Sequence, residues 1–208
     1  MRVRASIAVL LLSAAALTAC ATSGGSSPTT SGTASASAEQ TPTDTPTPSP
    51  TIDSDDPSTW IITEDGMGPI ALGDPFPEAL ALMPEGTRND TTNCAWTAWW
   101  NAPDQSYQVF AARASDSADD GPVINVSTDS WSDPAVADGP RTAEGIGVGS
   151  TVDEVRAAYP AAIEMPDSIG PDIVYLKVGR IFFTYRETPV ITSITVTTAD
   201  VPPYEVCG

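Results

Sequence analysis

The chain has 208 residues, of which 27 are Asp or Glu, 9 are Lys or Arg and none is His. The lack of histidine excludes Ser/His/Asp and Cys/His catalysis and every imidazole metal site. The formal net charge of −18 repels nucleic acid phosphates, so we expect no nucleic acid partner, and no motif predicts a cofactor or a metal ion.

The N-terminus has the features of a lipoprotein export signal. Arg2 and Arg4 precede an apolar run over residues 5–16, which is too short for a membrane span and has the length of a signal-peptide core. The next four residues, Leu17-Thr18-Ala19-Cys20, resemble the lipobox of bacterial lipoproteins. The resemblance implies cleavage after Ala19 and attachment of diacylglycerol and a palmitate-type acyl chain to Cys20. The alternative is an ordinary secretory signal whose cleavage site contains a cysteine.

A tether follows the predicted lipidation site. Up to about residue 58 the chain is rich in Ser, Thr, Ala, Gly and Pro and has little apolar surface to bury, so we predict a disordered linker. The sequence therefore divides into a signal peptide over 1–19, a lipidated cysteine and linker over 20–58, and a globular domain over 59–208. We expect the lipid to hold this domain outside the cytoplasm, on the outer face of the cytoplasmic membrane or, in a Gram-negative source, on the outer membrane.

Two segments of the globular region match when the sequence is shifted by 76 positions. Each has a polar residue that can cap a helix (Asp74 and Ser150), apolar residues at helical spacing, and a proline that ends the helix. We therefore predict one short helix in each segment. The identical pairs are Ile70/Ile146, Gly73/Gly149, Glu78/Glu154 and Pro84/Pro160.

Three strand-like runs follow each predicted helix, separated by polar turns. Alternating apolar and Ser or Thr residues in the last run are typical of a sheet with one solvated face. The predicted strands cover residues 92–101, 106–113, 122–128, 172–178, 180–185 and 190–198. The expected fold is α+β, with two tandem repeats of a short helix packed on a three-stranded antiparallel meander, over about 59–135 and 136–208.

The helix entry, with Gly-polar-x-x-x-Glu at 73–78 and 149–154, and the meander after it resemble the β-lactamase inhibitory protein family and the small lipoproteins of the β-barrel assembly machinery. The resemblance covers both halves of the globular region. It implies a concave sheet that grips a protein partner without catalysis. This chain lacks the cysteine pair that the inhibitor family has in each repeat, so no inhibitory residue is transferred to it.

Two cysteines remain once Cys20 is assigned to lipid. They are Cys94, on the first predicted meander strand, and Cys207, next to the C-terminus. In an oxidising compartment an even remainder of two predicts one disulfide, which would fasten the end of the second repeat to the first. Neither cysteine lies in a CxxC motif, so we favour a structural bridge over a redox or metal-binding pair.

A cluster of aromatic residues provides the candidate binding face. Strand alternation places Trp96 and Trp100 on one face with Cys94 and directs Trp99 to the other. We predict that Trp99 and its neighbour Tyr107 lie on a sheet face that binds a partner, because exposed tryptophan is frequent in binding surfaces. The alternative is that all three tryptophans are buried.

The acidic residues give a weaker signal. Residues 116–121 resemble the start of a calcium loop, but Ala118 and Ser127 stand at two ligand positions, so we predict a solvated turn. Glu78 and Glu154 recur near the helix starts, where the helix dipole favours negative charge. Lys177 lies at a predicted hairpin turn, where we expect it to be exposed.

These observations predict a membrane-anchored, non-catalytic lipoprotein that binds a protein or cell-wall component, with a basic partner favoured by the acidic surface. Two alternatives remain at this point. One is a carbohydrate- or cell-wall-processing enzyme that uses two carboxyl groups. The other is an envelope structural protein without a discrete ligand.

Overall fold

The computed structural model describes residues 53–131, 134, 137–166, 170, 172–204 and 206–207. The predicted signal peptide, Cys20 and most of the predicted linker lie outside these residues. All described residues belong to one compact unit. It is an α+β unit with two sheets and two α-helices, and strands predominate.

The elements follow one another in an order that places one helix before each group of long strands. They are η1 (Pro57–Thr59), β1 (Ile61–Thr63), β2 (Gly66–Met67), β3 (Ile70–Ala71), α1 (Phe76–Leu82), β4 (Thr97–Asn101), β5 (Gln108–Arg113), β6 (Val123–Asp129), β7 (Arg141–Thr142), α2 (Val152–Ala158), β8 (Ile163–Pro166), β9 (Val174–Val178), β10 (Ile181–Tyr185) and β11 (Ser193–Thr197).

The larger sheet has seven antiparallel strands in the order β4-β5-β6-β11-β10-β9-β8. The meander β4-β5-β6 and the meander β9-β10-β11 meet along β6 and β11, where Val126 is opposite Val196. All six predicted strands are confirmed. The first begins at Thr97 instead of residue 92, because Asp90 Oδ1 accepts hydrogen bonds from the backbone N–H groups of Thr92 and Asn93 and forms a turn there.

Strands β1, β2, β3, β7 and β8 were not predicted. The first four form a small sheet in the order β3-β2-β1-β7 and contain only two or three residues each, so they carry no readable period. Strand β8 contains Pro166 and pairs with β9 at the edge of the larger sheet, the position that proline tolerates.

Both helices exist, and each begins one residue later than predicted. Thr151 caps α2 in a capping box with Glu154, whereas Pro75 precedes α1 without a side-chain cap. The two residues predicted to cap the helices, Asp74 and Ser150, accept hydrogen bonds from the preceding turns instead. Asp74 Oδ2 accepts from Ala71 N–H at 3.2 Å, and Ser150 Oγ accepts from Gly147 N–H at 3.1 Å.

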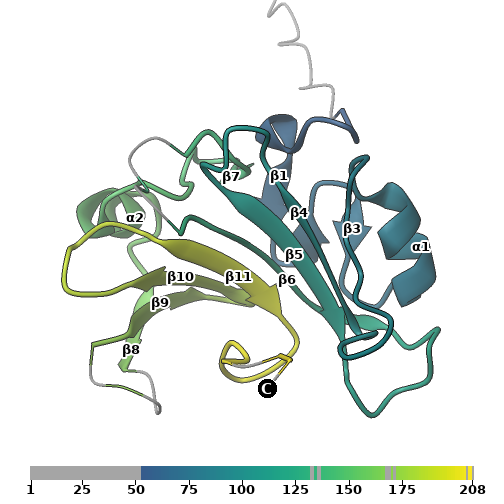
Figure 1. Ribbon diagram of the computed structural model, residues 1–208. Helices are drawn as coiled ribbons and strands as arrows, with labels where there is room; N and C mark the ends of the chain where they lie inside the picture. Colours follow the sequence, from purple (N-terminus) through teal and green to yellow (C-terminus); the bar gives the residue numbers. More distant parts are fainter. Residues whose placement is uncertain are drawn as a thin grey trace, which may run out of the picture. The chain divides into compact units, whose positions relative to one another are not determined.

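The main core lies between one face of the seven-stranded sheet and the layer formed by the helices and the small sheet. Figure 1 shows both helices, β1, β3 and β7 on this side of the large sheet. Trp60, Phe76 and Val155 come from that layer and are buried. They contact a sheet face made of Ala98, Val109, Ala111, Val126, Ile181, Phe183, Ile194 and Val196.

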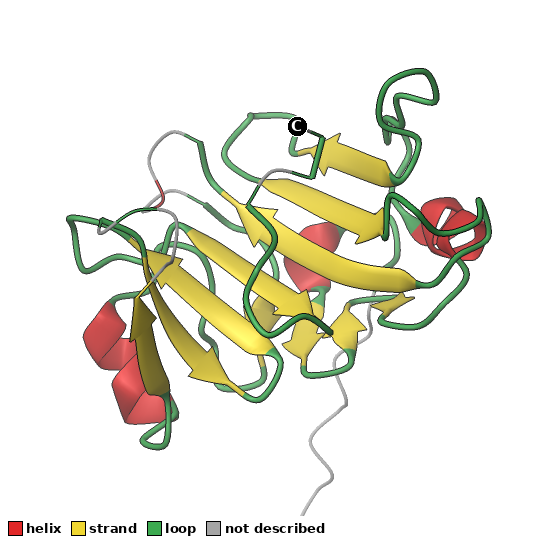
Figure 2. Cartoon of the chain, turned by 90° about the horizontal axis from the view of Figure 1, so that it is seen from below, coloured by secondary structure: helices red, strands yellow, loops and turns green. Residues whose placement is uncertain are grey.

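We call the other side of the seven-stranded sheet its second face. The C-terminal segment passes along this face after β11 (Figure 2). Lys177 Nζ donates to Asp200 O at 3.3 Å and lies 4.8 Å from the Phe182 ring centroid. The lysine is half-buried, so the prediction that it is exposed is wrong. A second apolar cluster of Ile173, Tyr175 and Phe182 covers the β9-β10 end.

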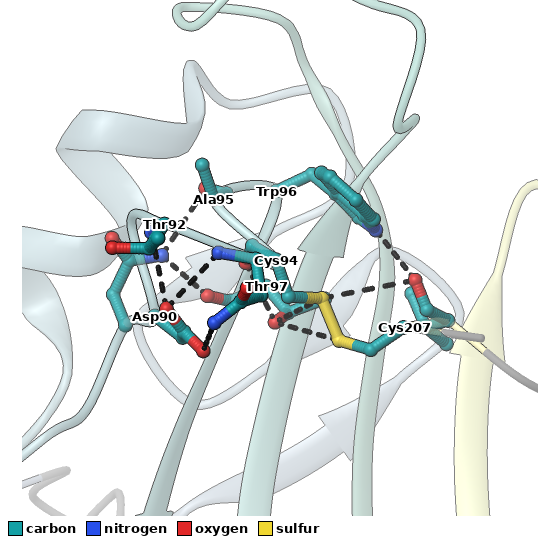
Figure 3. Close-up of a disulfide and its surroundings, with 10 residues drawn as sticks. Asp90, Thr92, Cys94, Ala95, Trp96, Thr97 and Cys207 are labelled. Atoms are coloured by element: carbon teal, nitrogen blue, oxygen red, sulfur yellow. Dashed lines mark hydrogen bonds between the residues drawn. A yellow bond between two sulfur atoms is a disulfide. The ribbon is translucent and has the colours of Figure 1, made fainter.

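The predicted disulfide between Cys94 and Cys207 is present, with the two Cα atoms 5.6 Å apart. Trp96 Nε1 donates to Val206 O at 2.5 Å, and Thr97 Oγ1 lies 3.4 Å from Cys207 Sγ (Figure 3). The bridge therefore fastens the end of the chain to the turn that precedes β4.

The acidic segment 116–121 is a turn, as predicted. Arg113, which is 4 % exposed, pairs with Asp119 at 2.8 Å and also donates to Ser117 O. The cation that pairs with Asp119 is therefore a side chain of the protein itself.

Candidate binding site

The three clustered tryptophans have different surroundings, and each is half-buried. The prediction that strand alternation places Trp96 on one face with Trp100 and Cys94 is wrong, because Trp96 and Cys94 precede β4, which begins at Thr97. Trp96 holds the C-terminal segment through its indole N–H. Trp99 lies on the second face opposite Phe110, and Trp100 lies on the core side opposite Val109.

Tyr107 does not lie beside Trp99 on an exposed face, and that prediction is wrong. It is 6 % exposed and packs against Trp100, with ring centroids 5.9 Å apart. The reason is the hairpin register. Val109 is opposite Trp100 on the core side, and Tyr107, two residues before Val109, continues that side just before β5 begins.

The outer edge of β4 is already covered. Trp99 exchanges two backbone hydrogen bonds with Arg88, at 2.8 and 2.9 Å. Asn89 Nδ2 donates to Thr97 O at 2.5 Å. These contacts occupy the backbone groups that an added strand would need at Thr97 and Trp99.

Two pockets lie on either side of Trp100, at the end of the β4–β5 hairpin. The first has a volume of about 300 Å³ and combines two indoles with amide and charged side chains. Its lining is Glu85, Gly86, Arg88, Trp99, Trp100, Asn101, Pro103 and Gln105. Trp100 Nε1 donates to Glu85 O at 3.1 Å, which fixes the indole between the two pockets.

The second pocket has a volume of about 320 Å³ and is strongly acidic. Trp100 and Tyr107 form its aromatic wall, and its carboxylates come from the segment before β1, the hairpin loop and the segment before β7. Its full lining is Asp55, Asp56, Pro57, Trp100, Ala102, Pro103, Asp104, Ser106, Tyr107 and Asp138.

Local hydrogen bonds hold the acidic residues in place. Asp104 Oδ1 accepts from Ser106 N–H at 3.0 Å and from Ser106 Oγ at 2.7 Å, and these bonds lower the pKa of Asp104. Asp56 Oδ1 accepts from Ser58 N–H and caps η1. Gln105 has φ 61°, which allows the loop to turn tightly between the two pockets.

Tyr107 lines the second pocket together with its carboxylates. Burial raises the pKa of Tyr107 to about 12, and the negative charges of Asp56, Asp138 and Asp104 add to the rise. The phenol is therefore neutral at physiological pH. It can both donate a hydrogen bond and accept one.

A further carboxyl group lies on the second face, away from both pockets. Burial raises the pKa of Asp129 to about 6, and the hydrogen bond from Gln108 Nε2, at 2.9 Å, opposes this rise. The shift needs no second carboxylate, so Asp129 does not indicate the carboxylate pair of a glycoside hydrolase.

The raised pKa of Asp129 predicts a pH-dependent stability. The folded-state pKa lies above the ordinary aspartate value of 3.8, so the folded protein binds the proton more tightly and loses stability as pH rises from about 4 to about 6. The loss is at most about 3 kcal/mol. Asp129→Asn is expected to lack it and to gain stability over the parent with rising pH in urea denaturation at pH 4 to 7. A difference that does not change with pH would contradict this origin, and Asp116→Asn is the control.

Sequence reasoning missed the acids of the second pocket and the exposed Trp131. Trp131 has 80 % of its surface exposed and follows β6 in a segment that had no predicted role. A tryptophan three residues after a predicted strand was the one available signal for it. No sequence signal indicated the acids of the second pocket, because they come from three separate parts of the chain.

In the described part of the chain, no three His, Cys, Asp or Glu residues are placed to hold a metal ion. The same residues contain no helix that is long and apolar enough to span a membrane. Comparison of the chain with protein-family models, curated proteins and solved structures finds no match. The likeness to the inhibitor family therefore depends on the sequence motifs alone.

Proposed function

We propose that this protein is a membrane-anchored, extracytoplasmic and non-catalytic binding lipoprotein. A lipid on Cys20 would hold it, the Ser/Thr/Pro-rich segment would extend it from the membrane, and the end of the β4–β5 hairpin would bind a protein or another envelope component. The observation that carries the proposal is the position of Trp100 as the common wall of two pockets. Concave sites with aromatic walls and a few polar groups are the usual form of ligand sites.

We infer that the two halves of the domain are tandem repeats of helix and meander. In each half, the glycine before the helix has positive φ, 95° for Gly73 and 90° for Gly149. Gly73 donates its N–H to the first residue of β6, and Gly149 donates to Ile191, two residues before β11. In each half, the accepting residue donates back to the residue after the glycine. The supporting hydrogen bonds are Gly73 N–H to Val123 O, Val123 N–H to Asp74 O, Gly149 N–H to Ile191 O and Ile191 N–H to Ser150 O, all at 2.8 or 2.9 Å.

The anchor is tested with the full chain in a bacterial host that processes lipoproteins. The parent is expected to incorporate labelled palmitate and to sediment with membranes. Cys20→Ser is expected to lose both properties. Export of unlabelled parent protein into the medium would show an ordinary secretory signal instead.

The binding site is tested by affinity capture from solubilised envelope with the full-length protein. Trp99→Ala with Arg88→Ala alters the first pocket, and Asp104→Asn with Asp138→Asn alters the second. At least one of these double variants is expected to lose a protein or glycan that the parent retains. Trp131→Ala is the matched control, because Trp131 lines neither pocket. If only Trp131→Ala loses the ligand, the hairpin site is wrong.

A further inference from the structure

We infer that the second pocket binds an organic cation, an alkylammonium or guanidinium group that enters between the carboxylates and rests against Trp100 and Tyr107. This inference rests on the proposed function and names the chemistry that one of its two pockets would recognise.

The first observation is unpaired negative charge. Asp55, Asp56, Asp104 and Asp138 all line the pocket, and all four are exposed. The ion pairs within the described residues involve other acids. Asp56 and Asp104 use Oδ1 in their local hydrogen bonds, so Oδ2 of each stays available to a ligand.

The second observation is independent of these charges. Tyr107 is 94 % buried, since 6 % of it is exposed, and it lines the pocket. No hydrogen bond joins its hydroxyl to any residue that the structure describes, so the hydroxyl is available to a ligand in the pocket. Tyr107 lines the pocket together with Asp56, Asp104 and Asp138. Its oxygen can accept a hydrogen bond from a ligand N–H.

The third observation is a rigid aromatic wall. The rings of Trp100 and Tyr107 are tilted by 57° with centroids 5.9 Å apart, and the Trp100 indole N–H is fixed on Glu85 O. Gly139 packs so closely on Tyr107 that an added Cβ would lie 2.9 Å from its ring. Aromatic faces attract ammonium and guanidinium groups, and a wall held in place loses little entropy on binding.

The size of the pocket favours an organic cation. A volume of about 320 Å³ is at the lower end of the range for small-molecule sites and accommodates the end of an arginine or lysine side chain. The net charge of −18 would also attract such a group over a longer range.

The test measures binding to the full chain by NMR, through the indole resonance of Trp100 and the backbone amides of residues 104–107. The first probe is N-acetyl-arginine amide, and N-acetyl-citrulline amide is its uncharged isostere. A blocked glycine peptide with one central arginine and free putrescine then distinguish a protein side chain from a small polyamine.

We expect saturable shifts with the arginine probe, no shifts with citrulline, and weaker binding at high salt. Asp104→Asn and Asp138→Asn are each expected to weaken binding about two- to fivefold, and Tyr107→Phe about three- to tenfold. Because the Tyr107 hydroxyl has no internal partner in the described residues, Tyr107→Phe should keep the parent's melting temperature. Asp116→Asn, which changes an exposed acid outside the pocket, should bind like the parent.

Equal binding of citrulline and arginine, or no saturable shift up to about 10 mM, would overturn the inference. Its failure is distinguishable from that of the proposed function. If capture still depends on Trp99 and Arg88 while no cation binds, the hairpin site stands and the cation is wrong. If the cation binds and nothing is captured, the pocket stands and a small amine becomes the ligand to pursue.

Discussion

Removal of the disulfide, by Cys94→Ala together with Cys207→Ser, is expected to lower the free energy of unfolding by about 3 to 5 kcal/mol. The bridge joins residues 113 positions apart, so it removes much conformational freedom from the unfolded chain. It also holds the C-terminal segment, which is otherwise fastened by contacts such as those of Trp96 with Val206 and Lys177 with Asp200. Alanine is chosen at Cys94 because that residue is 3 % exposed and a buried serine hydroxyl would add its own cost.

The measurement is urea denaturation of the oxidised parent, the reduced parent and the double variant. Reduction should reproduce most of the loss seen in the variant, because both open the same loop. A loss below about 1 kcal/mol in both would contradict the prediction and mean that closing this loop contributes little to stability. The hairpin pockets lie at the other end of β4 from Cys94, so cation binding by the variant that stays folded should be unchanged.

Local patterns in the sequence were sufficient for the elements that have a clear period. The six meander strands and both helices were predicted because their apolar residues alternate or recur at helical spacing over five residues or more. The helix starts were displaced by one residue because Asp74 and Ser150 hydrogen bond to the preceding turns instead. Both roles suit a short polar side chain, and the sequence does not distinguish them.

The candidate site depended on contacts between distant segments and could be predicted only in part. Trp100 was singled out, but its partner is Tyr107, because the turn residues Ala102 to Tyr107 carry the tyrosine back to the core side. The acidic wall joins Asp55 and Asp56 with Asp104 and Asp138. Nothing in the sequence relates these positions, since η1 and the hairpin loop come together only in the folded chain, where Trp60, directly after η1, belongs to the core.

Gly68→Ala is expected to destabilise the fold strongly, because Gly68 packs directly against the ring of Trp60. Gly68 has φ +57°, and a Cβ there would lie 2.3 Å from the Trp60 ring. The left-handed backbone and the forced shift of a fully buried indole together are expected to cost about 3 to 5 kcal/mol. Gly73→Ala is the matched control, because Gly73 has φ +95° and open space around it. It should lose only about 1 to 2 kcal/mol.

The same substitution connects the fold to the site. Trp60 Nε1 donates to Asp53 O at 2.9 Å, and Trp60 N–H donates to Pro57 O at 3.1 Å, so a displaced indole moves the segment that carries Asp55 and Asp56. Gly68→Ala should therefore weaken binding of the arginine probe under conditions where the variant remains folded, and Gly73→Ala should not. Equal losses of stability in the two variants would mean that the indole relaxes freely. In that case Trp60 does not hold the acidic wall in place.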